Sequence, residues 1–302
     1  MHIGVSIAEP TGPRALSLLC DQLRRAADDG FSSAWLAQLF GLDALTAFAV
    51  AGSQVEGIEL GTAVVPVYPR HPAALAQQAL TVAAATGGRL TLGIGVSHKV
   101  VIEDMYGYSF DRPARYMSEY LSILLPLLDG QPASFTGETV SAHLSLSVTH
   151  PGRVPVLLAA LAPRMLRLAG GRADGTVLWM TGPATVAGHI VPTITAAAQA
   201  AGREPPRVVC VLPVCVTSDA DAARARAAEV FAIYGQLPSY RAMLDREGAA
   251  GPADVAIIGS EDTVSTQIGA LAQAGVTDFV ALEFSRGDDA VRTRTLLTSL
   301  VR

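Results

Sequence analysis

One stretch of the chain decides the fold: GIELGTAVVPVYPRHPAALAQQALTVAAATGGRLTLGIGVSH, from Gly57 to His98. A β-branched run over Ile58–Val65 predicts a strand, and Tyr68–Pro72 follows it as a loop. The alanine-rich segment Ala73–Ala85 predicts a helix, and the apolar run Arg89–Val96 predicts a second strand. Two almost wholly apolar strands joined by one helix are typical of a parallel βαβ unit that is buried on both faces.

The same alternation of strand and helix extends outward in both directions. Eight strands are predicted, each followed by helical sequence, with no linker or break in composition between them. The predicted strands are His2–Ala8, Phe31–Ala37, Ile58–Val65, Arg89–Val96, Val154–Ala160, Thr176–Met180, Arg207–Thr217 and Thr277–Phe284. The sequence therefore predicts an α/β fold, a single (β/α)8 TIM barrel that forms one domain over residues 1–302. A doubly wound open sheet is the alternative, but no G-x-G-x-x-G motif follows the first strand.

Two segments depart from the alternation. Ser134–Thr149 alternates polar and apolar residues around Thr136-Gly137-Glu138, which predicts a hairpin insertion between strands 4 and 5. After strand 7, the charged segment Asp219–Glu247 predicts one long helix. Gly235–Gly251 is rich in turn residues, and we expect it to form a lid over the barrel mouth.

Composition narrows the classes of function. Half of the 302 residues are apolar, 16% are charged and the net charge is −5, so we expect a large core and no nucleic-acid partner. The three cysteines have no metal-ligand spacing and suit a reducing compartment, so we expect a cytoplasmic protein. No membrane-spanning segment and no H-E-x-x-H, C-x-x-C or G-x-S-x-G motif is present. We therefore expect no membrane association, no metal site and no hydrolytic chemistry.

Small apolar residues mark several loops of the predicted barrel mouth. In a TIM barrel the active site is built from the loops at the carboxyl ends of the strands. Three of these loops, Gly61–Pro66, Ala159–Ala162 and Thr181-Gly182, have short side chains. Such loops let a flat ring and a phosphate approach the backbone, and a helix N-terminus binds the phosphate. The pattern suits a redox cofactor that the protein positions, and tight turns with ordinary packing explain it about equally well.

Several of these segments resemble one family. GTAVVPVYPRHP and GGRLTLGIG resemble the third and fourth βα units of the luciferase-like monooxygenase superfamily, and VPVLLAALAPRMLRLAGGRADGTVLWM resembles its fifth and sixth units. The likeness extends over nearly the whole chain and is closest to the branch that uses the deazaflavin coenzyme F420. It implies an F420-dependent oxidoreductase.

The resemblance also implies a set of site residues. A bulge with a non-prolyl cis peptide bond between Ala63 and Val64 would back the ring of the coenzyme, with Val65 beside it. The coenzyme tail would contact the loop after strand 4, Val96, Ser97, His98 and Lys99. The phosphate-binding stretch after strand 5 would be Ala159, Ala160 and Leu161. The end of strand 6 would supply further cofactor-binding residues, Trp179, Met180, Thr181 and Gly182. Leu161 replaces the glycine of the family in the phosphate loop.

The end of strand 2 departs from the family pattern. Relatives that oxidise alcohols or sugar phosphates carry an acid or Asn followed by His, and the His acts as base. This chain has Gln38 and Leu39 there. An amide orients a substrate but does not exchange a proton near neutral pH. The resemblance therefore implies a reductase that delivers hydride to a C=C or C=N bond, with Gln38 orienting and His98 or water supplying the proton. A structural or tail-binding role for His98 is the alternative.

Two other functions remain open at this stage. An FMN-dependent monooxygenase of the same superfamily would use the same barrel face, and a cofactor-binding barrel without turnover would explain the missing histidine. In each case the expected partners are a small molecule and, as in many relatives, a second copy of the chain in a homodimer.

Overall fold

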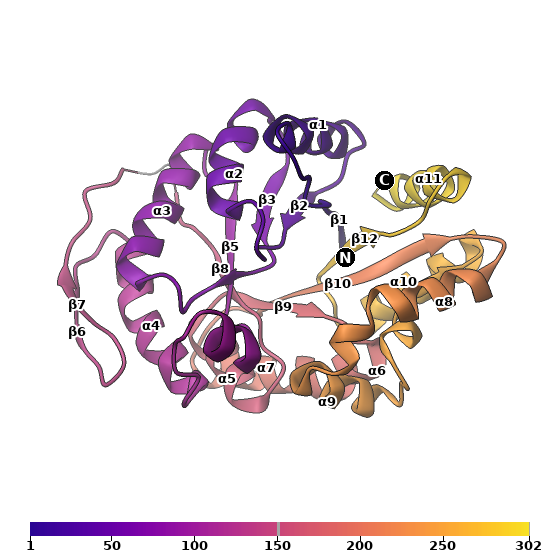
Figure 1. The fold of residues 1–302 in the computed structure, drawn as a ribbon. Coiled ribbons are helices and arrows are strands. Elements are labelled where there is room, and N and C mark those ends of the chain that lie inside the picture. The colour runs from indigo at the N-terminus through magenta and orange to yellow at the C-terminus, as the bar shows by residue number, and fades with distance from the viewer. Residues whose placement is uncertain (150–151, 302) are drawn as a thin grey trace.

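The computed structural model describes residues 1–149 and 152–301 of the chain. Eight parallel strands close into a barrel, because β10 pairs with both β9 and β12, and β12 pairs with β1. The barrel strands are β1 (His2–Ser6), β2 (Ser33–Leu36), β3 (Glu59–Thr62), β5 (Leu90–Gly95), β8 (Val156–Leu158), β9 (Gly175–Trp179), β10 (Arg207–Val216) and β12 (Asp278–Glu283). Helices surround the barrel (Figure 1). The predicted (β/α)8 barrel is confirmed.

Apolar side chains fill the interior of the barrel. All six residues of β5 are buried, as a strand covered on both faces requires. Trp35 is fully buried among the inward residues, and its indole N–H donates to Ser33 Oγ at 2.8 Å. A Cβ atom at Gly61 would lie 2.3 Å from the Trp35 ring, so that position in β3 requires glycine. Trp35 therefore packs in the barrel core.

Side-chain caps mark the start of two of the helices that surround the barrel. Asp43 caps α2 (Ala44–Ala51) by accepting from Thr46 N at 2.8 Å, and His71 caps α3 (Pro72–Ala85). The other helices that cover the barrel are α1 (Ala15–Asp28), α4 (Pro113–Leu128), α5 (Pro163–Arg172), α7 (Val191–Ala200), α10 (Glu261–Gln273) and α11 (Asp288–Val301). In the described part of the chain, no helix is both long and apolar enough to cross a membrane.

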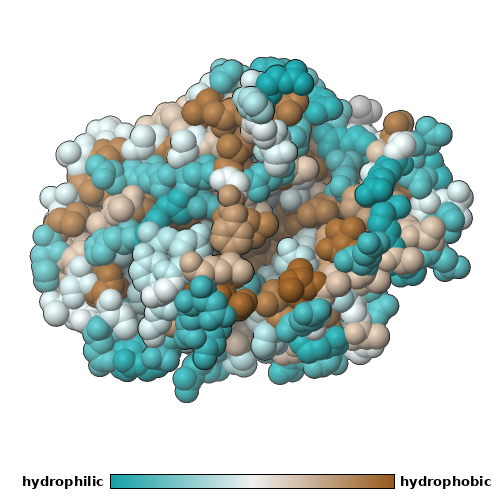
Figure 2. Space-filling model, viewed as in Figure 1, coloured by the Kyte–Doolittle hydropathy of each residue, from teal (hydrophilic) through white to brown (hydrophobic). Residues whose placement is uncertain are grey.

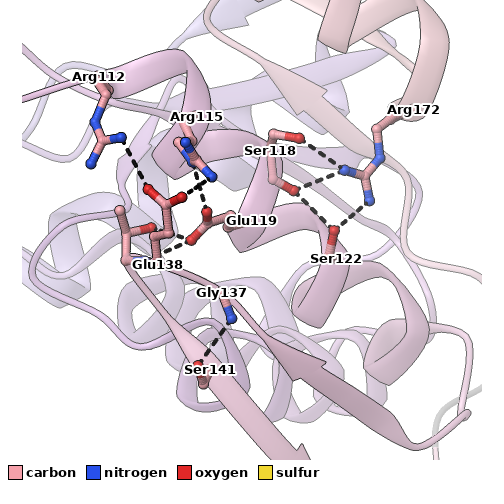
Figure 3. A network of polar contacts seen from close by, with 10 residues as sticks. Arg112, Arg115, Ser118, Glu119, Ser122, Gly137, Glu138, Ser141 and Arg172 are labelled. Atoms are coloured by element: carbon pink, nitrogen blue, oxygen red, sulfur yellow. Dashed lines mark hydrogen bonds and ion pairs between the residues drawn. The ribbon is translucent and has the colours of Figure 1, made fainter.

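The hairpin insertion is present between β5 and β8. Strands β6 (Ala133–Thr136) and β7 (Ser141–Leu144) pair antiparallel and lie outside α3 and α4 (Figure 1). Two carboxylates hold the hairpin turn to α4 (Figure 3). Glu119 of α4 accepts from Thr139 N in the turn, and Glu138 of the turn accepts from Arg112 and Arg115 at the start of α4.

The segment after β10 differs from the prediction of one long helix. It contains α8 (Ala220–Val230), the 3₁₀ turn η4 (Ala232–Gly235), α9 (Pro238–Glu247), the turn η5 (Pro252–Asp254) and a short strand, β11 (Ile257–Gly259). Pro238 supplies the first residue of α9, and Gly248, with φ of +76°, ends it. Strand β11 pairs with Val214–Val216 at the end of β10. Residues 217–256 are therefore an excursion from the carboxyl end of strand 7, and α10 is the helix that completes this unit.

Candidate active site

The break between β3 and β4 (Val65–Pro66) lies at the barrel mouth. The peptide bond between Ala63 and Val64 is cis, as predicted. Ala63 N donates to Leu36 O at 2.9 Å, so the bulge stays attached to β2. A Cβ atom at Gly95 would lie 2.8 Å from Val64 Cγ2, so the Val64 side chain needs glycine in β5 beneath it.

A small apolar floor lies at the bottom of the mouth. Ala63, Val64, Trp179 and Leu282 are partly buried and pack on the inward side chains of the barrel. Figure 2 shows a hollow in this face of the molecule, with mostly hydrophobic colours at its wall. The buried indole N–H of Trp179 has no hydrogen-bond partner among the described residues. A flat ring fits such a floor, because it covers apolar surface.

The loop after β5 contains four predicted tail-binding residues. Ser97 has φ of +61°, a conformation that is uncommon for a residue with a side chain. The His98 ring lies 5.3 Å from the Tyr240 ring, and burial lowers the pKa of His98 below 6.5. His98 is therefore mainly neutral near pH 7. Lys99 is exposed and pairs with Glu103 at 3.6 Å, on the π-helical turn η2 (Val100–Met105).

The loop after β8 contains the three predicted phosphate-binding residues. Ala159 N donates to Ile94 O at 2.8 Å, and the carbonyl of Leu161 lies 2.8 Å from His189 Nε2. These contacts fix the loop at both ends. The next residue, Ala162, precedes α5 without a side-chain cap, and Arg164 is exposed in the first turn. The free N–H groups and the nearby cation favour an anion at this helix N-terminus.

The end of β9 contains the last four predicted cofactor residues. Met180 is buried with φ of +52°, and Thr181 Oγ1 donates to Trp179 O at 3.1 Å. Gly182 precedes α6 (Pro183–Thr185) and lies against Glu247, because a Cβ there would lie 2.4 Å from the Glu247 carboxyl carbon. Trp179 thus reaches the floor while the residues after it turn toward α9.

Gln38 lies at the end of β2, where its side chain has a structural contact. Gln38 Oε1 accepts from Ala44 N, at the start of α2, at 3.2 Å. The next two side chains, Leu39 and Phe40, are 61% and 67% exposed, and the Phe40 ring lies 6.3 Å from Tyr106. Leu39 and Phe40 make this part of the rim apolar, and the nearest carboxylate, that of Glu9, accepts from Leu42 N.

The sequence predicted a lid after β10 but not its contacts. Tyr234 and Tyr240 extend an aromatic chain from Trp179 to His98, with neighbouring ring centroids 5.3–5.5 Å apart. Glu247 accepts from Ala184 N at 3.0 Å and Thr185 N at 2.7 Å. The helix α9 is thus docked across the mouth, beside the predicted cofactor residues. Its tyrosines give no site signal in the sequence, because their neighbours come from distant strands.

All of the predicted positions lie at the carboxyl ends of barrel strands, so the parallel barrel brings them to one mouth. Residues 2–278 match the family model described as luciferase-like monooxygenase. The chain belongs to this family. Among relatives of this luciferase-like chain, a 5,10-methylenetetrahydromethanopterin reductase of Methanolobus tindarius is 29% identical over 262 residues, 86% of this chain and 79% of the relative.

A second relative of this luciferase-like oxidoreductase is named for its coenzyme. A putative coenzyme F420-dependent oxidoreductase of Mycobacterium tuberculosis is 36% identical over 164 residues, 50% of this chain and 47% of the relative. Among solved structures, the coenzyme F420-dependent tetrahydromethanopterin reductase of Methanopyrus kandleri superposes with a TM-score of 0.82. That match covers 98% of this chain and 97% of the other at 23% identity, and it supports the barrel fold.

Proposed function

We propose that this oxidoreductase uses coenzyme F420 and acts as a reductase on a C=C or C=N bond of a small molecule. One observation carries the direction of the reaction: Gln38, at the end of β2, uses its carbonyl oxygen to accept from Ala44 N, and Leu39 follows it. Oxidation of an alcohol needs a base to take the hydroxyl proton, and neither side chain is one. Reduction of a polarised double bond does not need that base.

The residues of the mouth fit a deazaflavin. Ala63, Val64 and Trp179 would support the flat ring, and the uncapped start of α5 with Arg164 would bind its anionic tail. Bound in reduced form, the coenzyme supplies the hydride. The names of relatives in the methylenetetrahydromethanopterin reductase and F420-dependent groups support this choice.

The chain's own residues then orient the substrate and exclude water. Leu39, Phe40 and Tyr106 offer apolar contacts to a substrate at the rim, and α9 with Tyr240 covers the other side. His98 stands at this cover and is our candidate to hold or deliver a proton, with water as the other source. Gln38, with Oε1 engaged, retains its amide N–H groups to orient a substrate carbonyl.

FMN is the second candidate, because the family is that of luciferase-like monooxygenases and the same apolar floor accepts a flavin ring. Separate fluorescence titrations of the purified protein with F420 and with FMN decide between them. We expect tight binding of F420 and weak binding of FMN, followed by oxidation of reduced F420 when an activated alkene or imine is added. Preference for FMN, with oxygen consumption, would replace our proposal by the monooxygenase.

A pair of variants tests the position of the coenzyme tail. Arg164→Gln should weaken F420 binding about fivefold to tenfold, because one cation near the anionic tail is removed. Arg24→Gln, on the exposed face of α1, is the matched control and should leave the affinity unchanged. Equal affinities of the two variants would move the tail away from α5. The homodimer stays a prediction, which light scattering of the same preparations tests.

A further inference from the structure

The loop after β8 is tied to a histidine from the next βα unit. His189 Nε2 lies 2.8 Å from Leu161 O. A carbonyl oxygen only accepts hydrogen bonds, so the ring nitrogen is the donor and Nε2 carries the proton. The bond joins the loop to the π-helical turn η3 (Val186–Ile190), because His189 lies 28 residues after Leu161. His189 is thus the first candidate to control the conformation of this loop.

The local sequence explains why η3 has the wide π-helical form. Val191 N donates to Val186 O, five residues back, and Pro192 then has no N–H to continue a regular ladder. The turn begins and ends on buried side chains. Thr193 Oγ1 donates to His189 O at 2.7 Å. The backbone of His189 is therefore fixed from both sides.

Close packing of two helices brings η3 beside the loop. Helix α7 continues directly from η3 and packs along α5 (Figure 1). A Cβ atom at Gly170 in α5 would lie 2.2 Å from Ile194 O in α7, so this approach of the two helices requires glycine. Because α5 begins directly after the loop, the same packing places the His189 ring against Leu161 O.

The bond to His189 sets the direction of the N–H group that follows. In a trans peptide the C=O of Leu161 and the N–H of Ala162 point in opposite directions, so the bond turns this N–H away from η3. The N–H groups of Leu161, Ala162 and Arg164 have no acceptor among the described residues. They are therefore free to donate to an anion that lies beside the start of α5.

The same bond accounts for a leucine in place of the family's glycine. Among described residues with a side chain, positive φ occurs at Ser97, Arg112 and Met180, so Leu161 has an ordinary backbone conformation. The loop therefore does not use the conformational freedom of glycine. Its orientation comes from the bond to His189 instead.

We propose that His189 is a positioning residue for the coenzyme phosphate, which it serves by holding Leu161 O so that the Ala162 N–H and its free neighbours meet the phosphate. This inference rests on the phosphate-binding role proposed above for the loop. It applies to F420 and to FMN alike, because both carry a phosphate beyond the ribityl chain. Without the bond, the peptide between Leu161 and Ala162 becomes ordered only when the coenzyme binds, which lowers the affinity.

Fluorescence titrations with two pairs of ligands test the proposal. One pair is F420 and the deazaflavin that ends at the ribityl chain, and the other is FMN and riboflavin. The members of a pair share a ring, and only the first carries a phosphate. With the pair that the parent protein prefers, we expect His189→Phe to weaken the phosphate-bearing ligand about tenfold and the phosphate-free ligand less than about twofold. His189→Gln keeps an N–H donor and should recover most of the affinity.

Thr193→Val is the matched control, because it removes a bond within the same helical segment without touching Leu161. Both ligands should bind this variant as they bind the parent protein. Equal weakening of both ligands by His189→Phe would assign a purely structural role to His189. Unchanged affinity in His189→Phe, or a His189→Gln protein no better than His189→Phe, would also overturn the proposal. A parent protein that binds neither F420 nor FMN would refute the proposed function itself, and this inference with it.

Discussion

Glu119 is a buried carboxylate that holds the hairpin insertion to α4. It accepts from Thr139 N at 2.8 Å, Thr139 Oγ1 at 2.6 Å and Arg115 Nε at 3.1 Å. Burial by itself raises the pKa of Glu119, but the bonds from Thr139 and Arg115 outweigh it and lower the pKa to about 2. Because the unfolded carboxyl titrates near 4.5, the stabilisation is complete above that pH and is lost as the pH falls toward 2.

We expect Glu119→Gln to lower the free energy of unfolding by about 2 kcal/mol at neutral pH, because three donors lose a charged acceptor. The difference from the parent protein should shrink between about pH 4.5 and pH 2. Urea denaturation at several pH values measures it. Glu138→Gln is the control, because the Glu138 side chain is 52% exposed, and its effect should stay within about 1 kcal/mol. A deficit of Glu119→Gln that persists in acid would contradict this account.

His98 gives a second prediction at this scale. Its pKa is lowered from 6.5 by burial, so its acid form becomes scarce as the pH rises through that lowered value. If His98 delivers the proton, the rate of reduction should fall over that pH range, and His98→Asn should slow it about 100-fold and remove this limb of the profile. NMR titration of the ring gives the pKa directly. An unchanged profile in His98→Asn would assign the proton to water and leave His98 as a packing partner of Tyr240.

At the scale of elements, α9 is docked by one side chain. Glu247 accepts from the backbone N–H groups of Ala184 and Thr185, and Thr185 Oγ1 donates to Met243 O at 3.2 Å. Glu247→Gln removes the charge from these bonds, so we expect the amides of α9 to exchange hydrogen about tenfold faster. Asp245→Asn changes an exposed acid on the same helix and should alter exchange little. Uniform protection in both variants would show that aromatic packing, rather than Glu247, docks the helix.

Local sequence signals predicted most elements but not the excursion that contains α9. The βαβ unit and the hairpin depend on patterns within a few residues, and both are present. Strand β11 has three residues and pairs with the end of β10, about 40 residues earlier, so no local sequence pattern predicts it. The position of Tyr240 over His98 has the same cause. The rule that a TIM-barrel site lies at the carboxyl ends of the strands therefore locates the mouth. The residues that cover the mouth depend on tertiary packing, which local sequence does not specify.

At the scale of the whole molecule, the two ends of the barrel differ in kind. The carboxyl end carries the floor, the positive-φ residues Ser97 and Met180, and the docked α9, whereas the amino end is closed by an ion cluster. There Arg207, at the start of β10, reaches Glu59 Oε1 at 2.9 Å and Asp278 Oδ1 at 2.7 Å. These partners begin β3 and β12, so one guanidinium joins strands on different sides of the barrel.

This arrangement separates stability from function. Arg207→Met leaves the buried carboxylate of Asp278 without its cation, so we expect a loss of about 3–5 kcal/mol in the free energy of unfolding by urea. Arg207→Met/Asp278→Asn should recover part of that loss, because the uncompensated charge is gone. Arg153→Met breaks an exposed pair with Asp174 and should cost less than about 1 kcal/mol. Coenzyme affinity of the folded Arg207→Met protein should stay within about twofold of the parent, because the site lies at the opposite end of the barrel. A large loss of affinity in the folded variant would mean that the amino end positions the mouth, and that the two ends act as one unit.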